Sequence, residues 1–162
     1  MGTINATLVA QTAANELIGA TLRAGKTIRL TVPTQSMFPL LAPGDEVTAR
    51  PLRSGEPRPG DITLAWDGTY WIAHRVVEKQ MTKKIICYLT KGDNCNEPDS
   101  LWSADQICAK IIAVEKNNRV VNLESKRATI LGIAIAQFTR IQLRVARGRP
   151  RIQRIFAALI ER

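Results

Sequence analysis

Short stretches in which apolar and polar residues alternate fill most of the first 123 positions. Alternation with a period of two is typical of a β-strand that buries one face. Asp67-Gly68 marks a tight hairpin turn, Asn117-Asn118 marks a second turn, and the Pro- and Gly-rich segment 51–60 reads as a loop. The pattern predicts a mainly β body, either a small barrel or a folded sheet, with strands over 28–32, 47–50, 61–66, 69–78, 85–90, 107–115 and 119–123.

Helical periodicity appears near both ends of the chain. The segment 13–24 is predicted to form a short helix, and Gly25 is placed to end it. Beyond the last predicted strand, 125–147 has apolar residues at helical spacing. Gly148 is predicted to break this helix, and Pro150 is suited to the start of another one. We therefore expect an N-terminal helix and two C-terminal helices around the β body.

Positive charge is concentrated in the last forty residues. The chain has a net charge of +9, and nine cations against two anions in 123–162 account for +7 of it. We therefore divide the chain into a β domain, 1–123, and a basic helical appendage, 124–162. The appendage could simply pack against the β domain. Alternatively, its basic and amphipathic helices could bind an anionic membrane surface or a partner protein.

Composition excludes several classes of protein. Hydrophobic residues make up 45% of the chain and charged residues 23%, so a packed core is expected and wholesale disorder is not. Aromatic residues are only 5%, which argues against a surface that stacks nucleic-acid bases. Three cysteines with no Cys-x-x-Cys pair, beside a single histidine, predict neither a zinc site nor a disulfide framework. We expect no cofactor and no metal.

The N-terminus lacks the basic start and apolar run of a signal peptide. The apolar segment 130–136 is far too short to span a bilayer. The expected location is the cytoplasm, peripheral to the membrane if the appendage binds lipid.

Ser36 lies in a stretch that two prolines stiffen. Pro33 and Pro39 each fix their own φ and favour an extended preceding residue. A hydroxyl on such a bend is held at a defined angle, as a catalytic nucleophile requires. The same features also suit an ordinary loop serine.

His74 is the only histidine, and it lies on a predicted strand. Alternation places it on the same side as Ile72 and Val76, facing inward, where it needs hydrogen-bond partners. Ser36 could be one partner and a carboxylate the other, an arrangement that activates a serine near neutral pH. Asp93 and Asp99, in the segment 91–99, are the candidate carboxylates, although each also suits a turn.

Five segments in order resemble the signal peptidase and LexA-type serine peptidases, and most closely the branch with a histidine base. They are Ser-Met-x-Pro at 36–39, Pro-Gly-Asp-x-Val at 43–47, Pro-Gly-Asp-Ile at 59–62, His-Arg-Val at 74–76, and Thr-Lys-Gly-Asp-Asn at 90–94 with a second aspartate at 99. Five segments over residues 28–115 are more specific than any one of them. The family's membrane enzymes carry an N-terminal transmembrane anchor, and this sequence shows none.

The resemblance implies the folded β-sheet of that family and a serine endopeptidase that cleaves a peptide or protein precursor. It assigns Ser36 as nucleophile, His74 as general base and Asp99 as the partner of His74, with Asp93 shaping the site. The N–H of Ser36 and the hydroxyl of Thr34 are the expected oxyanion donors. The alternative is a catalytically silent module of the same fold that binds a peptide as an added strand. Nucleic acid is not an expected partner.

Overall fold

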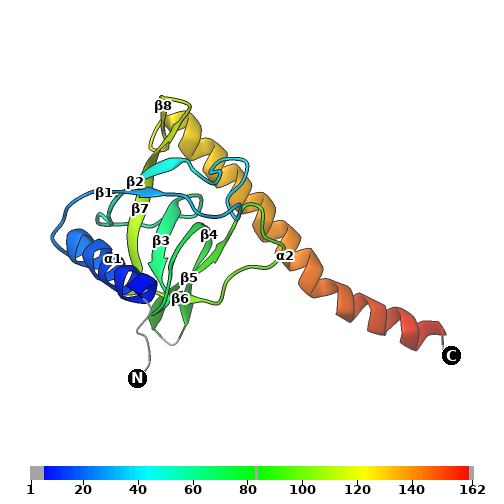
Figure 1. The fold of residues 1–162 in the computed structure, drawn as a ribbon. Coiled ribbons are helices and arrows are strands. Elements are labelled where there is room, and N and C mark those ends of the chain that lie inside the picture. Colours follow the sequence, from blue (N-terminus) through cyan, green and yellow to red (C-terminus); the bar gives the residue numbers. More distant parts are fainter. Residues whose placement is uncertain (1–5, 83, 161–162) are drawn as a thin grey trace, which may run out of the picture.

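An antiparallel sheet forms the centre of the molecule (Figure 1). The computed structural model describes residues 6–82 and 84–160, with side chains for 11–82 and 84–145. Between helix α1 (Ala6–Arg23) and helix α2 (Lys126–Ile160) lie eight strands. They are β1 (Ile28–Thr31), β2 (Glu46–Pro51), β3 (Ile62–Trp66), β4 (Trp71–Thr82), β5 (Ile85–Lys91), β6 (Trp102–Ser103), β7 (Ile107–Lys116) and β8 (Arg119–Asn122). The predicted mainly β fold is confirmed.

Strand β7 pairs with β2, β3 and β8. The strand order is β1-β2-β7-β3-β4-β5-β6, and β8 also pairs with β7. The register shifts between Thr48 and Ala49, between Leu64 and Ala65, and between Val76 and Glu78. Such bulges bend a strand and increase its twist, which lets the sheet curl. The short strand β6, of two residues, was not among the predicted strands.

Local turn chemistry explains several boundaries. Asn117 and Asn118 adopt φ values of 48° and 60°, as a two-residue turn between antiparallel strands requires. Gly25, two residues after the end of α1, adopts φ 76°, and its N–H donates to the carbonyl of Leu22. A glycine in this conformation ends a helix without steric cost. Both features agree with the sequence.

The main core lies between α1 and the first half of the sheet. Leu22 of α1 packs there with Val47 of β2 and Ile111 of β7. Met37 and Leu41 are 1% and 0% exposed in the same core. Because these two side chains are buried, the loop between β1 and β2 is anchored on the C-terminal side of Ser36.

The C-terminal prediction was wrong in one respect. A single helix, α2, runs from Lys126 to Ile160, so Gly148 does not break it and Pro150 does not begin a second one. A glycine inside a helix costs only about 1 kcal/mol, and a proline removes one hydrogen bond, so good helix formers on both sides can carry a helix across them.

Helix α2 packs against β4 through small residues. Gly132 is so close to the loop before β3 that a Cβ built on it would lie 2.7 Å from the carbonyl oxygen of Gly60. Ala136, one turn later, is fully buried. Small residues at these two positions let the helix backbone approach the body closely. Among the described helices, none has a stretch long and apolar enough to cross a membrane.

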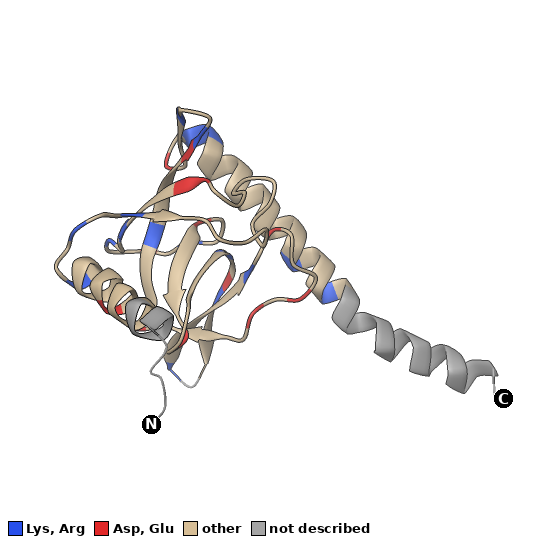
Figure 2. Ribbon diagram, viewed as in Figure 1, with Lys and Arg blue, Asp and Glu red and all other residues tan. Residues whose placement is uncertain are grey.

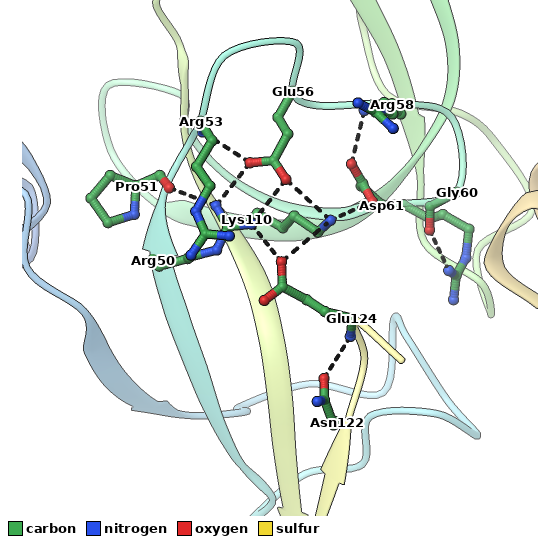
Figure 3. A network of polar contacts seen from close by, with 11 residues as sticks. Arg50, Pro51, Arg53, Glu56, Arg58, Gly60, Asp61, Lys110, Asn122 and Glu124 are labelled. Carbon is green, nitrogen blue, oxygen red and sulfur yellow. Dashed lines mark hydrogen bonds and ion pairs between the residues drawn. The ribbon is translucent and has the colours of Figure 1, made fainter. Parts of the chain in front are cut away.

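A network of buried charges connects the start of α2 with the sheet (Figure 3). Arg50 of β2 is 5% exposed and pairs with Glu56 through two hydrogen bonds of 2.8 and 2.9 Å. It also binds Glu124, two residues before α2. Lys110 of β7 adds a contact of 2.8 Å to Asp61. The network therefore joins β2, β7, the loop before β3 and the β8–α2 connection.

Candidate active site

Ser36 lies in the loop between β1 and β2, which is closed at its base by backbone hydrogen bonds. The N–H of Val32 donates to the carbonyl of Asp45 at 2.9 Å, and the N–H of Gly44 donates to the carbonyl of Val32 at 2.9 Å. The buried side chain of Met37 follows Ser36 directly. Ser36 is thus half-buried on a loop that is fixed at its base and by its neighbour.

The loop after β5 holds the Ser36 segment from the other side. The N–H of Asn94 donates to the carbonyl of Ser36 at 2.9 Å, and the side-chain amide of Asn94 donates to the carbonyl of Gln35 at 3.2 Å. The N–H of Asp93 points to the sulfur of Met37 at 3.4 Å. Residues that lie almost sixty positions apart in the sequence therefore form one site.

His74 of β4 is paired with Asp99. Its Nδ1 lies 2.7 Å from Oδ2 of Asp99, and the two side chains are 12% and 18% exposed. With the carboxylate ionised, Nδ1 carries the proton and donates it to Asp99. Nε2 of the neutral ring is then left with a free lone pair. That tautomer is the one that a general base requires.

Thr90 and Trp102, which were not among the predicted site residues, hold Asp99 in place. The indole Nε1 of Trp102 donates to Oγ1 of Thr90 at 2.8 Å, and Oγ1 of Thr90 lies within hydrogen-bond distance of Asp99 Oδ2. An ionised carboxylate can only accept, so the Thr90 hydroxyl donates its own proton to Asp99 while it accepts from the indole. The N–H of Asp99 also donates to the carbonyl of Thr90 at 2.9 Å. These contacts hold Asp99 in place independently of its contact with His74.

Gly92 brings His74 and the Ser36 segment together. A Cβ built on Gly92 would lie 2.9 Å from Nε2 of His74 and 2.6 Å from the carbonyl oxygen of Ser36. Sγ of Cys95 would lie 2.5 Å from the same point. The free nitrogen of the imidazole thus faces the Ser36 segment across a space that only a glycine leaves open.

Asp93 has a different partner from Asp99. It binds Arg75 through two hydrogen bonds of 2.8 and 2.6 Å, and the two side chains are 11% and 4% exposed. Arg75 also donates to the carbonyl of Gly60 at 2.8 Å. The residue pattern left open which aspartate contacts His74, and the family resemblance favoured Asp99. In the structure Asp99 contacts His74 and Asp93 binds Arg75. Arg75 itself was not among the predicted site residues.

The hydroxyl of Ser36 lies 3.2 Å from that of Thr34, whose side chain belongs to an exposed residue. Within the described residues, no hydrogen bond joins Ser36 to His74, and none uses the N–H of Ser36 as donor. The hydroxyl of Thr34 thus lies next to that of Ser36, and the N–H of Ser36 has no described acceptor. Donors so placed could stabilise a negative oxygen next to Ser36.

No group of three or more His, Cys, Asp or Glu side chains in the described part of the chain could hold a metal ion. A search with models of protein families finds none that matches this chain, and a search of curated proteins finds no match either.

Proposed function

We propose that this chain is a serine endopeptidase of the signal-peptidase-like type, with Ser36 as nucleophile, His74 as general base and Asp99 as its orienting partner. The observation that supports it is the contact of 2.7 Å between Nδ1 of His74 and Oδ2 of Asp99. A carboxylate there favours the proton on Nδ1, and Nε2 lies on the side of Gly92 and the Ser36 segment. The five sequence segments that resemble that family contain all three residues.

The chemistry has three steps. Nε2 of His74 accepts the Ser36 proton as Oγ attacks a peptide carbonyl, and the resulting oxyanion is bound by the N–H of Ser36 and the hydroxyl of Thr34. The imidazolium then gives its proton to the leaving amine, and an acyl-enzyme remains. Water, deprotonated by His74, hydrolyses the acyl-enzyme. Asp99 stabilises the imidazolium throughout, and the substrate is a peptide or protein precursor.

A silent peptide-binding module of the same fold is the second candidate. It is favoured by the hydroxyl of Ser36, which contacts Thr34 and has no described hydrogen bond to His74. Catalytic hydrogen bonds are often long before substrate binds, so the same observation is compatible with an enzyme.

Peptide cleavage distinguishes the two candidates. Wild type, Ser36→Ala and His74→Ala are incubated with a library of unstructured peptides, and the products are identified by mass spectrometry. The peptidase predicts cleavage by wild type that both substitutions abolish. Cleavage that survives either substitution would contradict the assigned roles. If wild type cleaves nothing, peptides retained by Ser36→Ala would support the binding module.

A further inference from the structure

Four large apolar side chains in the described part of α2 are exposed on one side of the helix. Ile130, Phe138, Ile141 and Val145 are 68%, 63%, 59% and 57% exposed, and we call these four residues the outer stripe. Intervals of eight, three and four residues place them on one side of a helix. The opposite side contacts the body through Gly132 and Ala136. The apolar side therefore needs a partner other than the sheet of its own chain.

The same spacing continues in the sequence of α2 beyond Val145. Ile152 follows Val145 by seven positions, and Leu159 follows Ile152 by seven. Helix α2 is continuous to Ile160, so the pattern spans most of its length. An amphipathic stretch of this length is typical of a helix that lies on another surface.

The positive charge of α2 distinguishes between the surfaces that could cover the outer stripe. From Lys126 to Ile160, α2 carries eight Lys and Arg residues and no Asp or Glu. Figure 2 shows the cations of the described part in blue. Two copies of α2 packed stripe to stripe would bring sixteen cations together. In the described part of the helix only Arg140 and Arg144 have an anionic neighbour, Glu78 of β4, at 3.8 and 3.7 Å, so most of this charge would oppose self-association. A nucleic acid would complement the charge but would gain nothing from exposed Phe, Ile and Val side chains.

We propose that α2 docks the protein on an anionic lipid bilayer, with the outer stripe inserted at the level of the headgroups and the cations paired with lipid phosphates. Both kinds of side chain on the helix then have a favourable environment. The apolar side chains are removed from water, and the arginines lie next to negatively charged lipid phosphates. This docking does not depend on catalysis by Ser36.

Vesicle flotation of the full chain tests this proposal. Vesicles of phosphatidylcholine with about one third phosphatidylglycerol are compared with phosphatidylcholine alone. The double variant Phe138→Ser, Ile141→Ser removes the centre of the outer stripe. Its matched control is Met81→Ser, Val120→Ser, which changes two residues that are 74% and 69% exposed and lie outside α2.

Wild type and the control should bind the anionic vesicles, and the stripe variant should bind about tenfold more weakly or worse. Replacing Arg149, Arg151 and Arg154 by Gln, or raising the salt from about 0.05 M to about 0.5 M, should also weaken binding. No binding by wild type, or equal binding by the stripe variant, would overturn the proposal. A stable dimer in solution that the stripe variant dissociates would overturn it too, because a second copy would then be the occupant.

Discussion

The indole N–H of Trp102 donates a hydrogen bond of 2.8 Å to the hydroxyl of Thr90, and that hydroxyl lies within hydrogen-bond distance of Asp99. An ionised carboxylate can only accept, so Asp99 accepts from both the Thr90 hydroxyl and Nδ1 of His74. Trp102 thus helps to hold in place, through Thr90, the carboxylate that faces Nδ1 of His74.

Thr90 is therefore expected to act as a positioning residue. Thr90→Val keeps the shape of the side chain but removes the hydroxyl, which leaves the Trp102 N–H buried without an acceptor at a cost of about 1–3 kcal/mol. If the chain is a peptidase, kcat should fall about tenfold while KM stays near its wild-type value, because the orientation of the base is affected and substrate binding is not.

Thr90→Ser is the matched control for this prediction. It retains the hydroxyl and should recover most of the lost kcat, although it leaves a small cavity. A structural role alone would give parallel losses of kcat and stability in both variants. Thermal unfolding measured beside steady-state kinetics separates the two cases, and a Thr90→Val protein with wild-type kcat would contradict the argument.

Substitutions of Asp99 and Asp93 should have different effects, one on activity and the other on stability. Asp99→Asn can present an N–H to Nδ1 of His74 and so favour the wrong tautomer, which should lower kcat by about 10²–10⁴ with little change in stability. Asp93→Asn instead leaves Arg75, 4% exposed, with an uncompensated buried charge, and should lower the free energy of unfolding by about 3 kcal/mol. Urea unfolding and peptide cleavage on both variants check the two expectations. Equal effects on both measurements would refute the separate roles.

Gly92→Ala tests how closely His74 and the Ser36 segment must approach. The new methyl group would meet the carbonyl oxygen of Ser36, Nε2 of His74 and Sγ of Cys95, all within 3 Å of the Cβ position. A displacement of about 1 Å can cost about a hundredfold in rate, so a loss of that order is expected in kcat for peptide cleavage. Adding Cys95→Ala removes only one of the three clashes and should not restore activity. Full recovery in that double variant would show that Ser36 and His74 are not constrained by Gly92.

Much of the fold could be predicted from the sequence, because turns and helix ends depend on the conformational preferences of a few neighbouring residues. The turn at Asn117 and Asn118 and the helix end at Gly25 each rest on a backbone conformation that those residue types adopt readily. The continuous helix through Gly148 and Pro150 could not be predicted in this way. These two residues disfavour a helix locally, and the helix-forming residues on both sides of them compete with that effect.

The candidate site is only partly visible in the sequence. Ser36, His74 and Asp99 stand in recognisable segments, but the sequence alone does not distinguish Asp99 from Asp93. Thr90 and Trp102 look like an ordinary strand residue and an ordinary core residue, and their role depends on side chains that meet only after β5 and β6 pair. The outward direction of the outer stripe was equally hidden, because it depends on Gly132 and Ala136 facing the sheet.

Glu56 links the stability of the molecule to pH. The hydrogen bonds from Arg50 lower the pKa of Glu56 from 4.5 to about 2, against the effect of burial, with further contributions from the N–H of Arg53 and the charge of Lys110. In the window between these values the unfolded chain binds a proton that the folded chain does not. The stabilisation is therefore complete above about pH 5 and is lost as the pH falls toward 2.

We expect the difference in unfolding free energy between wild type and Glu56→Gln to shrink by about 2–3 kcal/mol between pH 6 and pH 2. Near pH 6 the variant leaves Arg50 without its bidentate partner, whereas at pH 2, close to the folded-state pKa, about half of the wild-type carboxyl groups are protonated. Glu97→Gln, an exposed position outside the ion pairs that the structure describes, is the control and should track wild type at every pH. Chemical unfolding across the pH range measures all three proteins. A difference for Glu56→Gln that stays constant with pH would mean that the network of Arg50, Glu56 and Lys110 does not hold its charges as the structure shows.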